Sequence, residues 1–289
     1  MFLGAGKLRR LVLLFVAVLL VNANCQEKPS VHEVVIAAAD KHGNPVAVSQ
    51  GMLHASLDGE PLELESISSA KDRPLVFAVM LDITGSMRDK EIFSKDVSRS
   101  IFKALTDKGG VGYFGVFGKR IEVSSAPVTL DRVNQIISPK GMEGRIPVAA
   151  AVKEASTHAL SRNSNPGTLR RVLVLVTDGD DNATKQDMDE AIEAAQREGV
   201  SVAVLGLMGI QDTKKAKEKL RMFSSETAGT IVLLDGPGEY MRKLMPYFDE
   251  QFVLSFRDST HSDGKLHALN VSTGTRDLQI SAPQKVVVR

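Results

Sequence analysis

Hydrophobic and polar positions follow two different periods along the middle of this chain. Predominantly apolar runs of strand length occur at Val76–Leu81, Val111–Phe117, Val172–Val176, Val200–Leu207 and Thr230–Leu234. After the first run, apolar residues instead recur every four positions, at Phe93, Val97, Ile101 and Leu105. Four-residue spacing is typical of a helix that buries one face. The middle of the chain is therefore predicted to alternate strands with helices.

Further helices are predicted at Leu130–Ile137, Pro147–Leu160, Lys185–Glu198, Ala216–Thr227 and Glu239–Phe248. Strands that alternate with helices form a parallel sheet covered on both faces, because parallel strands need crossover connections. We therefore expect an α/β fold of the doubly wound, Rossmann-like kind, with a mostly parallel sheet and helices on both of its faces.

The two ends of the mature chain have a different pattern. Residues 26–70 and 251–289 contain short strand-like runs separated by turn signals such as Asp58-Gly59, and they lack a helical period. We predict a small β module at 26–70, an α/β domain at 71–250 and a C-terminal β extension at 251–289.

Residues 1–25 are predicted to be an export signal. Lys7, Arg9 and Arg10 precede the apolar run Leu11–Val21, which is shorter than the ~20 residues that a membrane-spanning helix needs. We expect cleavage near Ala23 or Cys25 and a secreted, periplasmic or cell-envelope protein. Contact with a membrane is expected only if the signal stays uncleaved or if Cys25, the single cysteine, carries a lipid.

Composition changes the picture by exclusion. The 36 basic and 35 acidic residues nearly cancel, and no dense basic patch exists to neutralise phosphates, so nucleic acid is not an expected partner. The six histidines show no spacing typical of a metal site and are predicted to lie at the surface or in satisfied core positions.

The candidate chemistry lies where two of the apolar runs end. Asp82, Thr84 and Ser86 follow the first run at every second position, and Asp178 follows the run that ends at Val176. Ligand sites in such folds lie at the carboxyl ends of strands, so these oxygen-bearing side chains are predicted to form one two-loop oxygen site at this edge of the sheet. In the alternative interpretation, Ser86 caps the next helix and Asp178 only accepts hydrogen bonds from its own loop.

These two loops resemble those of a von Willebrand factor type A domain. The likeness is carried by LDITGSMRDK (81–90), VLVLVTDGDDN (172–182), VSVAVLGL (200–207) and FSSETAGTIVLL (223–234). The chain more closely resembles the secreted bacterial subgroup called VWFA-related, known from acidobacteria. The resemblance implies a metal-ion-dependent adhesion site with the pattern Asp-x-Ser-x-Ser, in which Thr84 stands for the middle serine.

The resemblance implies Mg²⁺ or Mn²⁺ bound by Asp82, Thr84, Ser86 and Asp178, with a partner protein's carboxylate completing the shell. One position departs from the family pattern, because Ile146 stands where a threonine ligand is usual. Isoleucine has no oxygen to offer, and Glu143 is the nearby alternative.

The expected function is a protein-binding, adhesion-type module. The main alternative is a metal-independent scaffolding module with a vestigial site. A phosphohydrolase-type enzyme is less favoured, because Thr84 stands where a second aspartate would be needed, and no nucleophile–base pair is evident. We therefore expect no enzyme activity and no small-molecule substrate.

Overall fold

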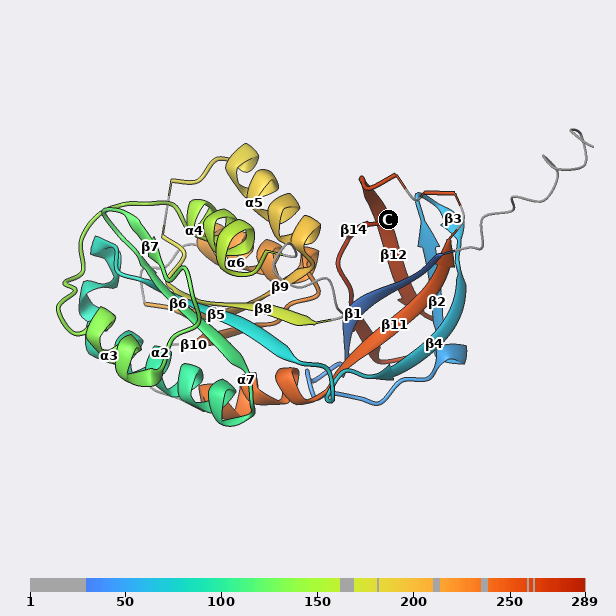
Figure 1. Ribbon diagram of the computed structural model, residues 1–289, viewed down its shortest axis with the longest axis horizontal. Helices are drawn as coiled ribbons and strands as arrows, with labels where there is room; N and C mark the ends of the chain where they lie inside the picture. The colour runs from blue at the N-terminus through green and yellow to red at the C-terminus, as the bar shows by residue number, and fades with distance from the viewer. Residues whose placement is uncertain are drawn as a thin grey trace, which may run out of the picture.

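The computed structural model describes residues 30–161, 169–180, 182–209, 214–234, 239–258, 260–261 and 263–288. They form an α/β domain with a β-sandwich beside it (Figure 1). The predicted export signal and Cys25 lie outside the described residues. In the described part of the chain, no helix is long and apolar enough to cross a membrane.

The α/β domain is built on a sheet of six strands. Their order across the sheet is β10 (Ile231–Leu234), β9 (Val200–Leu207), β8 (Arg170–Thr177), β5 (Leu75–Asp82), β6 (Val111–Phe117) and β7 (Ile121–Val123). All neighbours are parallel except β6 and β7. Since β5 lies directly beside β8, with Leu81 opposite Val176, the loops after these two strands emerge next to each other.

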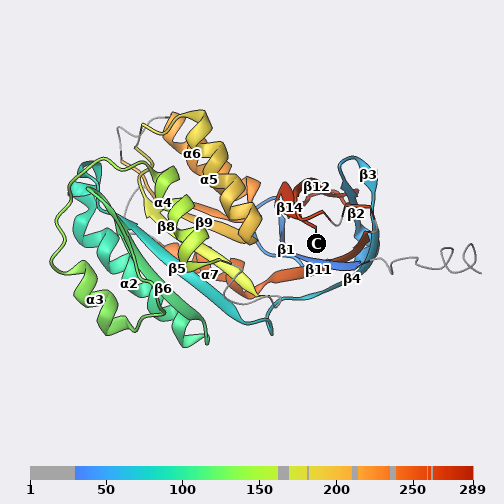
Figure 2. The same ribbon diagram turned by 45° about the horizontal axis from the view of Figure 1, so that its top comes forward.

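Helices cover both faces of this sheet (Figure 2). One face carries α2 (Glu91–Asp107), α3 (Leu130–Ile137) and α7 (Tyr240–Asp249), and the other carries α4 (Val148–Glu154), α5 (Lys185–Glu198) and α6 (Lys214–Glu226). Alternation along β5 explains this, because Phe77 and Val79 pack on the first side while Ala78 packs on the second. The doubly wound α/β fold predicted from the sequence is confirmed.

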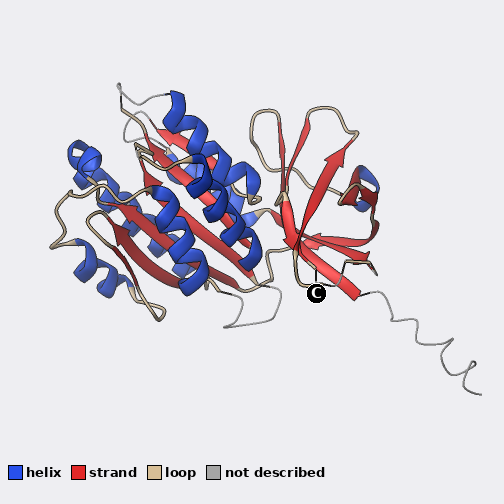
Figure 3. Ribbon diagram, turned by 90° about the horizontal axis from the view of Figure 1, so that it is seen from above, coloured by secondary structure: helices blue, strands red, loops and turns tan. Residues whose placement is uncertain are grey.

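The two flanking β segments form one body, a sandwich of two antiparallel sheets (Figure 3). One sheet has the order β13 (Leu278–Ser281), β1 (Ser30–Asp40), β11 (Gln251–Asp258) and β4 (Glu63–Ser69), and the other has the order β14 (Lys285–Val287), β12 (Leu266–Thr273), β2 (Leu53–Leu57) and β3 (Glu60–Pro61). Ile36, Leu57, Leu254 and Phe256 form part of the core between them. The N-terminal segment and the C-terminal segment each contribute two strands to each sheet, so neither segment forms a sheet without the other.

The sandwich attaches to the starting ends of the parallel strands. Arg170 begins β8 and is buried; its Nη1 donates to the Phe248 carbonyl at 2.6 Å and its Nε to the Arg73 carbonyl at 3.2 Å. The Ala70 amide donates to the Gln251 carbonyl at 2.8 Å. This hydrogen bond links the two segments that connect the sandwich to the α/β domain. This arrangement leaves the opposite edge, where β5 and β8 end, uncovered by the sandwich.

Candidate functional site

Strand β5 delivers Asp82 to the carboxyl edge of the sheet, where the side chain is almost completely buried, with 2 % exposed. Its Oδ1 accepts hydrogen bonds from the Thr84 amide at 2.8 Å and the Thr84 hydroxyl at 2.6 Å. Its Oδ2 accepts a hydrogen bond from the Thr177 hydroxyl. Burial raises the pKa of Asp82 to about 7, although these hydrogen bonds favour the charged form.

Strand β8 delivers Asp178 beside it, also buried. Ser86 Oγ donates to Asp178 Oδ1 at 3.2 Å and lies 3.1 Å from Thr84 Oγ1. The structure therefore brings together all four residues that the sequence singled out, from two loops 92 positions apart.

Ser86 does not cap the following helix. It lies inside a 3-10 turn, Gly85–Lys90, and no side chain caps the start of α2 at Lys90. The capping role in the alternative interpretation is therefore wrong for Ser86, whose hydroxyl faces Asp178 instead. Asp178 does accept a loop hydrogen bond from the Asp180 amide, at 3.1 Å, as that interpretation also expected.

Lys90 is the residue that sequence reasoning missed. Its Nζ lies 3.0 Å from Asp178 Oδ2, and its side chain is only 20 % exposed. Lys90 ends the same turn that contains Ser86, but nothing in the sequence distinguishes it from an ordinary solvated lysine. Asp178 thus divides its oxygens, with Oδ1 towards Ser86 and Oδ2 towards the ammonium group.

The oxygen spacing can be tested against a divalent ion. Magnesium prefers octahedral oxygen ligands at 2.0–2.1 Å, which places neighbouring ligand oxygens about 3 Å apart. The Thr84 Oγ1 to Ser86 Oγ and Ser86 Oγ to Asp178 Oδ1 separations, 3.1 and 3.2 Å, match that spacing. These three oxygens fit one side of a magnesium or manganese shell, and Asp82 holds Thr84 in place from below.

The loop that contains Gly144 and Ile146, the third loop of the site, is fixed against the loop after β5. It adds no oxygen-bearing side chain to the cluster. The Gly85 amide donates to the Gly144 carbonyl at 3.2 Å, and the Ile146 amide donates to the Gly118 carbonyl at 3.1 Å. Glu143 forms an ion pair with Lys119 at 2.8 Å. Ile146 and Arg145 line the cleft above the site, while Glu143 is not among its lining residues.

The cleft has a volume of about 510 Å³ and is open to solvent. Its lining residues come from all three loops: Thr84, Gly85, Ser86, Gly144, Arg145, Ile146, Asp180 and Asn182. Arg145 is an exposed cation on this lining, and Asp180 is an exposed acid. The arrangement therefore places the Thr84 and Ser86 side chains on an accessible polar cleft.

Residues 121–237 match the family model described as von Willebrand factor type A domain. The matched segment runs from β7 to just beyond β10, so it includes Asp178, and the Asp82 loop precedes it. No curated protein matches the sequence significantly.

Among solved structures, the chain is similar to manganese-loaded TRAP protein from Plasmodium vivax, with 13% identity, coverage of 76% of this chain and 96% of that one, and a TM-score of 0.48. It is also similar to an aerotolerance-related membrane protein from Bacteroides fragilis, with 15% identity, coverage of 61% and 98%, and a TM-score of 0.46.

Proposed function

We propose that this chain, of which residues 121–237 match the von Willebrand factor type A family model, binds a partner protein at the carboxyl edge of its central sheet. Domains of this type are generally interaction modules and not enzymes. In this proposal, Asp82, Thr84, Ser86 and Asp178 hold Mg²⁺ or Mn²⁺, and a carboxylate of the partner takes an open position on the ion. When bound, the ion would provide the positive charge that attracts that carboxylate.

The observation that carries the proposal is the spacing of three oxygens, Thr84 Oγ1, Ser86 Oγ and Asp178 Oδ1. Adjacent members lie 3.1 and 3.2 Å apart, as cis ligands of one small hard cation would. Thr84 and Ser86 line an open cleft that Arg145 also lines, and Asp178 is buried behind them. An exposed guanidinium there favours an acidic group on the partner, because arginine pairs well with carboxylates.

A second candidate is a metal-independent interaction module on the same face. One observation favours it: the Lys90 ammonium already lies 3.0 Å from Asp178 Oδ2. In that case, the lysine permanently supplies the positive charge that an ion would otherwise bring, and Ile146 is simply part of the binding surface.

Thermal melts of the purified chain separate the two candidates. With Mn²⁺ or Mg²⁺ in place of EDTA, the metal proposal expects a higher melting temperature, because a ligand that binds only the folded state stabilises it. Asp82→Ala should abolish this shift. The matched control is Asp131→Asn on α3, an exposed acid in the first turn of its helix, which should keep it. A wild type without any shift would refute the metal site and favour the second candidate.

The cellular location is a further part of this proposal. We propose that the protein works outside the cytoplasm, as the secreted bacterial VWFA-related proteins do, because residues 1–25 have the pattern of an export signal. Sequencing the N-terminus of protein recovered from envelope and medium fractions tests this. Recovery of the chain from the cytoplasm with Met1 or Phe2 as its first residue would contradict it.

A further inference from the structure

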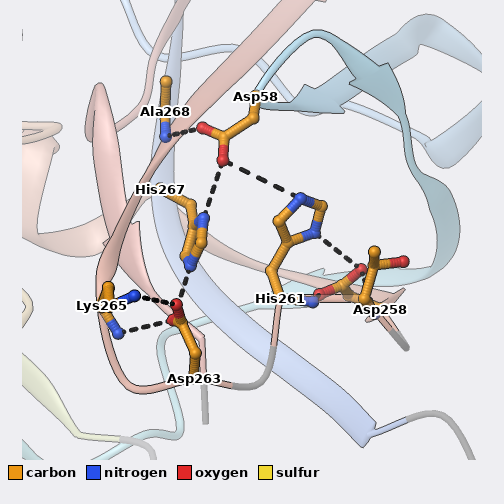
Figure 4. A network of polar contacts seen from close by, with 8 residues as sticks. Asp58, Asp258, His261, Asp263, Lys265, His267 and Ala268 are labelled. Carbon is orange, nitrogen blue, oxygen red and sulfur yellow. Dashed lines mark hydrogen bonds and ion pairs between the residues drawn. The ribbon is translucent and has the colours of Figure 1, made fainter.

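A second polar cluster lies in the β-sandwich, on the body of the molecule that the VWA domain does not include. Asp58 is in the turn between β2 and β3, His261 follows β11, and His267 is in β12 (Figure 4). One ligand atom from each residue lies within 4.8 Å of those of the other two. The spacing of the histidines along the sequence does not reveal this cluster, because the fold brings His267 to a residue 209 positions away.

The distances around Asp58 suit a small metal ion. His267 Nδ1 lies 2.8 Å from Asp58 Oδ2, and His261 Nε2 lies 3.9 Å from the same oxygen. Ligand atoms of tetrahedral zinc, at 2.0–2.1 Å from the ion, lie about 3.3 Å apart. The two observed separations fall on either side of this value, and all three ligand atoms lie within 4.8 Å of one another, so an ion would draw the His261 imidazole inwards.

The far side of each imidazole is held by its own carboxylate. His267 Nε2 lies 2.8 Å from Asp263 Oδ1, and His261 Nδ1 lies 3.1 Å from Asp258 Oδ1. A histidine whose outer N–H donates to a carboxylate presents the lone pair of its other nitrogen, as metal-binding histidines commonly do. Both lone pairs then face the same oxygen of Asp58.

Hydrogen bonds to Asp58 explain the position of His267 but not that of His261. A doubly protonated His267 could bridge Asp58 and Asp263, but His261 Nε2, at 3.9 Å from Asp58, is beyond hydrogen-bond reach. Three carboxylates contact the two imidazoles, namely those of Asp58, Asp258 and Asp263. Lys265, at 3.2 Å from Asp263 Oδ2, balances the charge of Asp263. The remaining negative charge suits a divalent cation.

We propose that Asp58, His261 and His267 bind a transition-metal ion, with zinc as the best match to two imidazoles and one carboxylate. Water completes the tetrahedral shell on the open side, where the Asp58 side chain is 42 % exposed. Bound there, the ion joins the turn between β2 and β3 to the β11–β12 connection. It thereby stabilises the pairing of the N-terminal and C-terminal segments of the sandwich.

The test uses the full chain without a histidine tag, stripped of metal by a chelator and then titrated with zinc against a chromophoric chelator. We expect one zinc ion per chain and, with Co²⁺, the visible absorption of a tetrahedral site. Asp258→Asn should weaken zinc binding by ~10–100-fold, because it removes the negative charge of the outer partner of His261. His261→Ala should weaken it further.

Two controls keep the result specific. His158→Ala removes an exposed histidine next to Glu154 and should leave zinc affinity unchanged. Asp82→Ala should also leave it unchanged, which separates this site from the sheet-edge site. Melting curves of the metal-free variants report whether each is folded, and Asp58→Asn replaces His261→Ala if the latter is not. The proposal is overturned if the wild type does not bind zinc, or if folded His261→Ala and Asp58→Asn bind it as the wild type does.

Discussion

Lys90 and Asp178 form an ion pair at the carboxyl edge of the sheet, with Nζ 3.0 Å from Oδ2. The acid is 1 % exposed and the lysine 20 % exposed, so bulk water screens the pair weakly. Any divalent ion that binds Asp178 Oδ1 must share the carboxylate with this ammonium group. Metal affinity at the sheet edge is therefore set by competition between the ion and Lys90.

We expect Lys90→Met to bind Mn²⁺ about tenfold more tightly than the wild type, because charge repulsion worth at least ~1 kcal/mol is removed. Isothermal titration calorimetry measures the affinity. Lys103→Met is the matched control, since Lys103 lies on helix α2, which begins directly after Lys90, but is 60 % exposed and pairs with Asp107.

The same variant also tests the stability of the pair. Without metal, Asp178 is left buried and unpaired, which should cost roughly 3 kcal/mol of unfolding free energy. Mn²⁺ should restore much of this loss. Unchanged or weaker Mn²⁺ binding by Lys90→Met would place the ion away from Asp178 and contradict the metal site.

A second prediction concerns Ala228, which follows α6 in a left-handed conformation with φ of 58°. Its carbonyl accepts the Tyr247 hydroxyl at 2.9 Å, which holds the turn in place. A residue with a Cβ pays a conformational penalty there that glycine avoids. Ala228→Gly should raise the free energy of unfolding by about 0.5–1 kcal/mol in urea denaturation.

Ala150→Gly is the opposite control, because Ala150 lies within helix α4. Glycine in a helix interior should lower stability by about 1 kcal/mol. If both variants were destabilised equally, the backbone argument for Ala228 would be wrong.

Local signals in the sequence were sufficient for the α/β domain. Helix α5 begins at Lys185 and ends at Glu198, as predicted, because Thr184 and Asp187 form a capping box and Gly199 ends the helix at φ of 65°. The meeting of Asp82 with Asp178 also followed from the pattern, since parallel strands end at one edge. These features depend on residues near one another or on the general geometry of the fold.

Contacts between distant segments could not be predicted in the same way. The pairing of β1 with β11 joins Ser30 to Asp258, and no turn or period in the sequence specifies it. The approach of His267 to Asp58 depends on another such pairing, between β2 and β12, in which Leu57 lies opposite Leu269. Lys90 was missed for a different reason, because a lysine after a turn is usually solvated and only the packing shows that it reaches Asp178.

A third prediction concerns Glu226, the last residue of α6. Burial and the nearby Asp189 raise its pKa above the ordinary value, against the effect of Lys285. The native state therefore holds this proton more tightly than the unfolded state, so stability present at low pH is lost as the pH rises above ~4.3. Glu226→Gln should melt at a higher temperature than the wild type near pH 7.

The difference between Glu226→Gln and the wild type should shrink as the pH falls towards ~4, where both side chains are neutral. Scanning calorimetry at a series of pH values measures it. Glu218→Gln, at an exposed position of the same helix, should show no such trend. A difference that grows on acidification would reverse the sign and contradict the assignment.

The last prediction concerns Gly144, which fixes the third loop against the first. It has φ of 99°, and a Cβ built on it would lie 2.1 Å from the Gly118 carbonyl carbon and 2.2 Å from the Lys119 nitrogen. Both are backbone atoms, so no side chain can move aside. Gly144→Ala should therefore lower the unfolding free energy in urea by more than about 2 kcal/mol. It should also weaken Mn²⁺ binding, because the Gly144 carbonyl holds the Gly85 amide beside Ser86.

Gly141→Ala is the matched control three residues earlier, since a Cβ there meets no atom within 4 Å. It should change stability by less than about 0.5 kcal/mol and leave Mn²⁺ affinity intact. Equal stability of the two variants would show that the loop does not press on Gly118, and Mn²⁺ affinity that survives in a destabilised Gly144→Ala would show that this loop does not position the metal ligands.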